Sequence, residues 1–239
     1  MKAIILAAGR GIRMKDLTEE YPKCLVDLRG KPLLEWQLLA LREAGIQEVA
    51  IVTGYKSELL SRYGLIEFHN PRWGKTNMVS SLACAEKWLL AGPCIVSYSD
   101  IFYEAATVKL LMRSSACLAI TYDPDWRALW EKRFGDPLID AETFRLNPDG
   151  TLAEIGNRPD SVEQVEGQYM GLLKFTPKGW SAAVGLRISL SSKEQDSMHM
   201  TGMLNGLIQN KILSVDAVAN TGSWGEIDNQ EDLNLYSRQ

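Results

Sequence analysis

The sequence lacks any long apolar run. Its apolar stretches are strand-sized, well below the roughly 20 residues that a helix needs to span a bilayer. Met1 and Lys2 lead directly into the first of them, without the pattern of a signal peptide. We therefore expect a cytoplasmic protein that has no membrane partner.

The sequence also has few cysteines and histidines and no excess of positive charge. Its four cysteines stand singly, without a Cys-x-x-Cys pair, and its two histidines are His69 and His199. This scarcity disfavours a zinc site and a disulfide framework. Lys and Arg number 26 against 30 Asp and Glu, which gives a formal net charge of -4. No general surface for nucleic acid is expected, and any anion-binding site has to be local.

Short apolar runs alternate with longer amphipathic ones over the first 125 residues. This pattern is typical of a mainly parallel sheet with helices on both faces, so we expect an α/β fold. A composition that is 46% hydrophobic over 239 residues is sufficient for a full core. The expected strands are 2–8, 48–55, 66–70, 93–100 and 117–123, and the expected helices are 32–46, 56–64, 77–92 and 104–114.

After residue 125 the regular alternation of strand-like and helix-like runs gives way to an α+β pattern. No repeat or flexible linker separates the halves 1–125 and 126–239, so we expect a single domain over 1–239. The expected elements are a helix at 126–134, a hairpin at 141–156 that turns on 147–150, a strand at 167–176, helices at 178–187 and 198–210, a strand at 214–220 and a final helix from about Asn229.

A glycine-rich turn follows the first strand. Small residues there let backbone N–H groups approach a phosphate closely. The dinucleotide fingerprint Gly-x-Gly-x-x-Gly fails, because Met14 stands where its third glycine is required. A P-loop ending in Gly74-Lys75-Thr76 also fails, because its first glycine falls on His69. Both common nucleotide-binding loops are excluded.

The remaining pattern is Leu6-Ala7-Ala8-Gly9-x-Gly11-x-Arg13-Met14 followed by Pro22-Lys23-x-Leu25-Val26. It resembles the signature of NTP-dependent nucleotidyltransferases that act on sugar phosphates and related phosphoesters. Segments 30–55 and 222–233 also resemble members of this family. The resemblance implies a Rossmann-like, glycosyltransferase-A-like sandwich, with a nucleotide-binding half at 1–125 and an acceptor-binding, closing half at 126–239.

The resemblance also implies roles for the charged residues. Lys23, Arg13 and Asp100 would be catalytic, with Lys23 directed at the α-phosphate and Arg10 and Arg13 at the β- and γ-phosphates. The alternative is that these cations form a solvated basic loop. The resemblance places the nucleotide on the first loop and the segments after the second and third strands, namely on Leu6, Ala7, Ala8, Gly9, Arg10, Gly11, Tyr55, Asn77, Ser80 and Ser81.

Two acids follow expected strands. Asp100 ends an apolar strand at the carboxyl edge of the sheet, where ligands bind in open α/β folds. Asp228 ends another, and Glu226 lies two residues before it on the same face. Mg²⁺ prefers oxygen ligands, and the resemblance places metal-binding acids at Asp100 and Asp228. Glu226 would be a third ligand or a partner of the others. Helix capping by Asp100 and Asp228 is the alternative.

The segment 76–82 resembles the choline-phosphate cytidylyltransferase branch and so favours CTP. Alternatively, Asn77 caps its helix while Ser80 and Ser81 face solvent or neighbours. The acceptor would be met by Trp126 and Trp130, on one helical face, and by Tyr169, because aromatic faces can enclose an ammonium. Core packing of the two tryptophans is the equal alternative. Acids that could meet an amine are Asp136, Asp140, Glu142 and Glu163.

Segments 126–144 and 167–176 resemble cytidylyltransferases for phosphocholine, 2-aminoethylphosphonate and phosphoglutamine. We therefore expect a Mg²⁺-dependent transfer from CTP to a small phosphorylated acceptor, with a cell-surface precursor as the product. A sugar-1-phosphate nucleotidyltransferase that uses another NTP is the alternative. A glycosyltransferase is disfavoured because Asp100-Ile101-Phe102 lacks the second acid of Asp-x-Asp, and a non-catalytic module because Lys23, Asp100 and Asp228 are all present. The sequence leaves a homodimer open.

Overall fold

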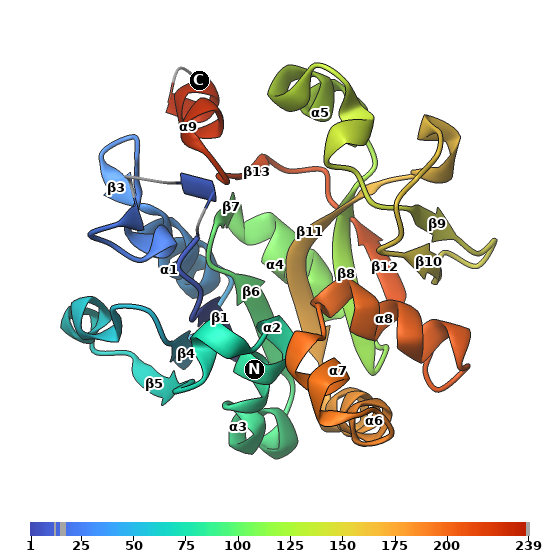
Figure 1. The fold of residues 1–239 in the computed structure, drawn as a ribbon, viewed down its shortest axis with the longest axis horizontal. Coiled ribbons are helices and arrows are strands. Elements are labelled where there is room, and N and C mark those ends of the chain that lie inside the picture. The colour runs from blue at the N-terminus through green and yellow to red at the C-terminus, as the bar shows by residue number, and fades with distance from the viewer. Residues whose placement is uncertain (12, 15–17, 238–239) are drawn as a thin grey trace.

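A central seven-stranded sheet organises the molecule, for which a computed structural model describes residues 1–11, 13, 14 and 18–237. Figure 1 shows the sheet running across the molecule from β5 to β12. Its strand order is β12-β8-β11-β6-β1-β4-β5, and only β11 runs antiparallel to its neighbours. The mainly parallel α/β sheet expected from the sequence is therefore confirmed. The strands are β1 Lys2–Ala7, β4 Val49–Thr53, β5 Ile66–His69, β6 Cys94–Tyr98, β8 Leu118–Asp123, β11 Gln168–Phe175 and β12 Asp216–Ala219.

The middle strands are apolar along nearly their whole length because helices cover both faces of the sheet. Four of the six residues in β1 are less than 5% exposed, and Ile5 lies opposite Ile51 of β4. Helices α1 (Leu33–Glu43) and α4 (Ala105–Arg113) pack together, and α3 (Glu86–Ala91) packs against α6 (Pro177–Ile188) at the bottom of Figure 1. Parallel strands end at a common edge, so the loops after β1, β4 and β6 lie side by side.

Three helical segments differ from the sequence-based expectation. The helix expected at 77–92 is two short helices, α2 (Met78–Ala83) and α3. The segment 56–64 is a 3₁₀ helix, η3 (Ser57–Tyr63), held between left-handed residues Lys56 and Gly64. Helix α7 (Ser192–Ser197) was not expected, although Ser191 and Glu194 form the capping box that marks its start. The two short helices α2 and α7 pack against each other.

The second half carries the expected α+β elements. Helix α5 spans Trp126–Phe134, and the hairpin β9 (Phe144–Leu146) and β10 (Leu152–Ile155) turns on residues 147–150. Gly150 has a φ of 81°, a left-handed conformation that glycine adopts without strain. Helix α8 (Met200–Gln209) contacts β10. These elements form the right-hand part of Figure 1, beyond β11.

The C-terminal segment closes over the first loop. Strand β13 (Trp224–Glu226) pairs antiparallel with β7 (Ile101–Tyr103), and helix α9 (Gln230–Ser237) follows it. Met14 and Leu28 of the N-terminal region pack with Ile227 and Tyr236 in a small core separate from the main one. Within the described residues, no helix is long and apolar enough to cross a membrane. The C-terminal segment is thus packed against a region near the start of the chain that is distant from it in sequence.

Candidate active site

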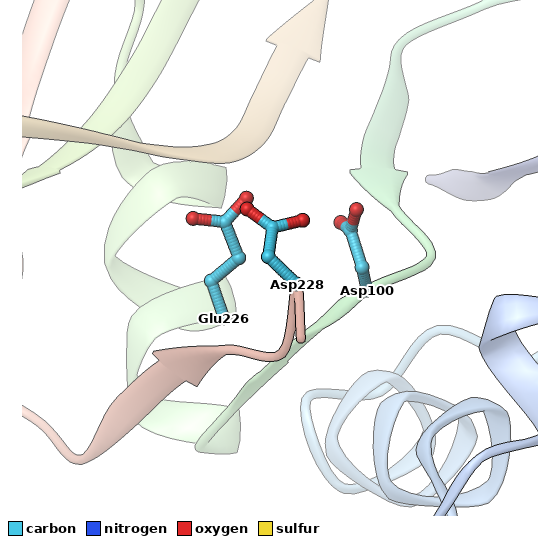
Figure 2. Close-up of side chains that lie close together, drawn as sticks. All are labelled: Asp100, Glu226 and Asp228. Atoms are coloured by element: carbon cyan, nitrogen blue, oxygen red, sulfur yellow. The ribbon is translucent and has the colours of Figure 1, made fainter. Parts of the chain in front are cut away.

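Three carboxylates converge at the carboxyl edge of the sheet. Asp100 follows β6, while Glu226 ends β13 and Asp228 lies two residues further. The pairing of β13 with β7 sets Glu226 opposite Ile101, and the N–H of Ile227 donates to the carbonyl of Asp100 at 2.9 Å. One oxygen from each acid lies within 4.8 Å of the others. Figure 2 shows the three side chains close together. The structure thus brings together the three acids predicted to bind metal.

Lys23 lies among these acids. Its Nζ is 2.7 Å from Oδ2 of Asp100 and donates a hydrogen bond to Oδ1 of Asp228. Burial disfavours the charged lysine, but the negative charges of Asp100 and Asp228 outweigh that effect and raise the pKa of Lys23 above its usual value. Burial likewise raises the pKa of Asp228, and the adjacent Lys23 more than reverses it, so the pKa of Asp228 is lowered. Both groups therefore remain charged at neutral pH.

Arg13 approaches the cluster from the first loop. Its Nη2 is 3.0 Å from Oδ2 of Asp228, and its Nη1 is 3.5 Å from Oδ1 of Asp140. The Arg13 side chain is 64% exposed, in contrast to that of Asp228, which is 2% exposed. Because the guanidinium of Arg13 is exposed, it can turn toward a bound phosphate without disturbing the buried core.

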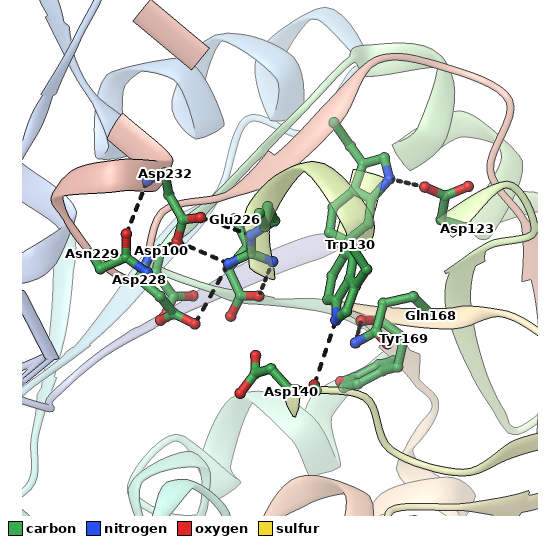
Figure 3. Close-up of polar contacts among 12 residues, drawn as sticks. Asp100, Asp123, Trp130, Asp140, Gln168, Tyr169, Glu226, Asp228, Asn229 and Asp232 are labelled. Atoms are coloured by element: carbon green, nitrogen blue, oxygen red, sulfur yellow. Dashed lines mark hydrogen bonds and ion pairs between the residues drawn. The ribbon is translucent and has the colours of Figure 1, made fainter. Parts of the chain in front are cut away.

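Arg133 of α5 forms ion pairs with acids on the C-terminal segment. Its side chain is fully buried and forms a bidentate ion pair with Asp232, with Nε–Oδ1 at 2.8 Å and Nη2–Oδ2 at 2.9 Å. Its Nη1 lies 3.2 Å from Oε2 of Glu226. Asp232 in turn accepts from the N–H of Asp228 at 2.9 Å, and these contacts appear in Figure 3. The contact between Arg133 and Asp232 was not predicted from the sequence, because the two residues lie 99 positions apart.

The capping alternative for the two aspartates is wrong. Asn229 caps α9, since its Oδ1 accepts from the N–H groups of Glu231 and Asp232 at 2.8 and 2.9 Å. Asp100 precedes β7 and not a helix. Its Oδ1 is buried, and no hydrogen-bond partner for it occurs among the described residues. A free carboxylate oxygen beside two other acids is a donor set that fits a hard divalent cation such as Mg²⁺.

Burial raises the pKa of Glu226, and the charges of Asp228 and Asp100 raise it further. Arg133 and Lys23 oppose this effect without cancelling it. A divalent cation placed between the three acids would remove the repulsion that raises this pKa. The electrostatics of Glu226 therefore agree with a cation site.

A cavity of about 480 Å³ opens beside Asp100 and Lys23. Trp73, Thr76, Met78 and Tyr98 add to its walls. Its wall includes most of the residues that were predicted to bind the nucleotide, namely Leu6, Ala8, Gly9, Arg10, Gly11, Asn77 and Ser81, together with Arg13. The volume suits a small-molecule site.

Two glycines allow loops of the site to pack closely against their neighbours. Gly11 has a φ of 71°, and a Cβ there would lie 3.0 Å from the Cβ and Cδ of Lys23. At Gly54 a Cβ would lie 2.6 Å from the carbonyl oxygen of Ala8. Both positions therefore need glycine for the first loop to pack against Lys23 and the end of β4.

Three predicted nucleotide-binding residues, Ala7, Tyr55 and Ser80, are not among those that line this cavity. Ala7 is buried within β1. The hydroxyl of Tyr55 donates to the carbonyl of Glu19, and its ring supports Trp73 edge-on at 5.4 Å. Ser80 donates to the carbonyl of Gln195 and accepts from Arg187. Side-chain alternation along β1 explains the orientation of Ala7, and the rotation between successive residues of α2 separates Ser80 from Ser81.

Asn77 and Ser81 make the contacts of the alternative interpretation and also line the first cavity. Asn77 caps α2, because its Oδ1 accepts from the N–H of Met78 at 2.7 Å, and it also lines the cavity. Ser81 is buried and accepts from Nδ2 of Asn70 at 3.0 Å. Arg10 lies at the open side, 44% exposed, with its guanidinium over the ring of Tyr55. All three residues line the first cavity.

A second cavity of about 340 Å³ adjoins the first. Arg13, Met78 and Tyr98 line both cavities, and Glu226 lines the second. Tyr169, predicted to contact the acceptor, also lines this second cavity. The carboxylate cluster and Lys23 therefore lie where two adjacent binding spaces meet.

The prediction of an acceptor-binding face at Trp126 and Trp130 is corrected. The two residues are 4% and 0% exposed, and neither lines the first or the second cavity. The indole N–H of Trp126 donates to the carbonyl of Val165 at 3.1 Å, and Trp130 stacks on Trp224 with ring centroids 6.2 Å apart. Their helical spacing reflects core packing, which was the alternative interpretation.

Comparison with known proteins gives a relative that matches nearly the whole chain and another that matches part of it. The chain is 37% identical to a CTP:phosphoglutamine cytidylyltransferase of Campylobacter jejuni subsp. jejuni serotype O:2, over 98% of both chains. It is 43% identical to a choline-phosphate cytidylyltransferase of Streptococcus pneumoniae, over 61% of this chain and 67% of the relative.

Solved structures show the same fold. The inositol-1-phosphate CTP transferase of T. maritima superposes with a TM-score of 0.77 at 19% identity, over 98% of this chain and 93% of the other. The CTP:phosphocholine cytidylyltransferase of S. pneumoniae superposes with a TM-score of 0.71 at 23% identity, over 99% and 97%. The model of the MobA-like NTP transferase domain matches residues 3–146, which include the glycine-rich loop, Lys23 and Asp100. The chain belongs to the MobA-like NTP transferase family.

Proposed function

We propose that this protein transfers a cytidylyl group from CTP to a small phosphorylated acceptor. The observation that carries the proposal is the position of Lys23, Arg13 and Asp100, which line the first cavity while Arg13 and Glu226 line the second. The nucleotide would occupy the first cavity and the acceptor the second. The choice of CTP rests on the cytidylyltransferase relatives, one of which matches 98% of the chain.

In the proposed reaction, an oxygen of the acceptor phosphate attacks the α-phosphorus of CTP. A new P–O bond forms there, the bond from the α-phosphorus to the bridging oxygen of the β-phosphate breaks, and pyrophosphate leaves with that electron pair. The attacking oxygen is already anionic, so no general base is needed. The difficulty is to bring anions together and to stabilise the charge that develops.

The positively charged side chains of the site would offset the repulsion between the anions. The ammonium of Lys23, held between Asp100 and Asp228, is directed at the α-phosphate region, and Arg13 and Arg10 are placed for the leaving phosphates. Asp100 and Asp228, with Glu226, would hold Mg²⁺. Mg²⁺ bound there would offset the negative charge of the phosphates. Removal of Mg²⁺ by a chelator should therefore abolish turnover.

A panel of reactions tests this function. The purified protein would be incubated with Mg²⁺, one of CTP, UTP, ATP or GTP, and a set of phosphorylated amines, amino acids and sugars, and pyrophosphate release would be measured. We expect CTP with a phosphorylated amine or amino acid to exceed all other pairs by roughly tenfold or more in kcat/KM. Turnover of another NTP with a sugar 1-phosphate, while CTP stays inert, would contradict the proposal.

A further inference from the structure

The second cavity contains a carboxylate that the proposed reaction does not use. Glu142 lies in its wall, half-buried, and its Oε1 accepts a hydrogen bond from Oγ1 of Thr201 on α8 at 3.3 Å. Gln168 and His199 line the same space. These groups lie outside the cluster of Asp100, Glu226 and Asp228 that surrounds Lys23.

Glu142 differs from its acidic neighbours in lacking a cation. Asp140 is paired with Arg13, and Glu226 with Arg133, but in the described part of the chain no Lys or Arg lies within ion-pair distance of Glu142. A half-buried carboxylate with a single hydroxyl partner is costly unless another group compensates its charge. Burial accordingly raises the pKa of Glu142. A cationic group of the ligand would supply the missing partner.

The charges of the cavity also orient an acceptor. Arg13 borders both cavities, so the acceptor phosphate belongs at that side, next to the first cavity. Glu142 would repel a phosphate and attract a positive group. An acceptor that carries a phosphate at one end and a cation at the other fits this distribution of charge.

The aromatic lining distinguishes between kinds of cation. Tyr98 and Tyr169 are the aromatic residues of this cavity within the described ranges, and their rings meet edge-on at 89° and 5.8 Å. A trimethylammonium group is bound by aromatic faces on several sides, and it has no N–H to donate. A primary ammonium has three N–H donors, and a carboxylate is their strongest acceptor.

We propose that the second cavity selects an acceptor with a primary ammonium group, which donates to Glu142 while the phosphate lies toward Arg13. The proposal rests on the function proposed above and specifies its acceptor as a phosphorylated primary amine or amino acid. Gln168 and His199 offer further hydrogen bonds to the remainder of such a molecule.

The test compares an acceptor with an analogue in which a methyl group replaces the ammonium. The shortest such pair is O-phosphoethanolamine and propyl phosphate, and phosphocholine is the third substrate. The best acceptor from the panel and its methyl analogue are measured in the same way. Pyrophosphate release from CTP is followed for the wild type, for Glu142→Gln, and for Glu58→Gln, which changes an exposed acid of η3.

We expect the wild type to prefer the amine over its methyl analogue by about tenfold or more in kcat/KM, mainly through KM, because a hydrogen bond between charged groups is lost with the analogue. Glu142→Gln should bring this ratio close to one, and Glu58→Gln should leave it unchanged. If Glu142→Gln does not fold, the wild-type preference alone decides.

Three results would overturn the inference while cytidylyl transfer stands: a best acceptor without a primary amine, equal use of phosphocholine and phosphoethanolamine, or an unchanged ratio in Glu142→Gln. The absence of pyrophosphate release with every nucleotide and acceptor would instead refute the proposed function, and the inference with it. The two failures are therefore distinguishable.

Discussion

Replacing Lys23 by alanine should lower kcat by about a hundredfold or more while the overall fold persists, because the variant loses a buried cation directed at the phosphate under attack. The same loss is expected for Asp100→Asn, which removes a carboxylate of the metal site. Initial rates of pyrophosphate release at saturating CTP and Mg²⁺ measure both effects. Circular dichroism would show whether both variants are folded.

Lys109→Ala is the matched control for Lys23→Ala. Lys109 is exposed on α4 and lies on no wall of the two cavities. Its replacement should leave kcat within about twofold of the wild type, because exposed charges contribute little. Near-normal rates in both Lys23→Ala and Asp100→Asn would refute the assignment of this site.

Arg133→Met should lower the free energy of unfolding by about 3 to 5 kcal/mol, because it leaves the buried Asp232 and the half-buried Glu226 without their cation. Methionine retains much of the volume, so the loss of charge dominates over the loss of packing. Denaturant unfolding monitored by circular dichroism measures the effect. The double variant Arg133→Met with Asp232→Asn should recover part of the loss, since the uncompensated charge of Asp232 is then gone.

Arg127→Met, on the same helix, is the control. Arg127 is 61% exposed and pairs with Glu131 one turn away, an interaction worth about 0.3 to 0.5 kcal/mol. If Arg133→Met costs no more than Arg127→Met, Arg133 does not support the acid cluster.

Local patterns predicted the fold well. The apolar runs of β1, β4 and β6 and the turn at 147–150 were each predicted from a signal confined to a few consecutive residues. The break between α2 and α3 was missed because a continuous amphipathic pattern does not show where tertiary packing interrupts a helix. The capping box at Ser191 would have indicated α7.

The site could be predicted only in part. The motifs located Lys23, Arg13, Asp100 and Asp228, because each stands in a compact sequence pattern at the end of a strand or in the first loop. The ion pair of Arg133 with Asp232 was not predicted, because the two residues lie 99 positions apart. Such long-range pairs leave no periodic signal in one sequence.

The tryptophans and the serine pair show a second limit. Helical spacing placed Trp126 and Trp130 on one face, but it could not tell whether that face meets a ligand or the core. Of two adjacent serines, Ser81 faces the first cavity and Ser80 faces Arg187. Which neighbour a side chain meets depends on tertiary packing, which the residue type does not encode.

The most direct test of the central claim is the fate of the α-phosphorus of CTP. CTP labelled at that atom would be mixed with enzyme, Mg²⁺ and the best acceptor in a single turnover, and the products would be separated. The label should appear in a product in which cytidylate is joined to the acceptor phosphate, while the β- and γ-phosphates leave together as pyrophosphate. Label found in free CMP, or transfer of the γ-phosphate to the acceptor, would contradict the account.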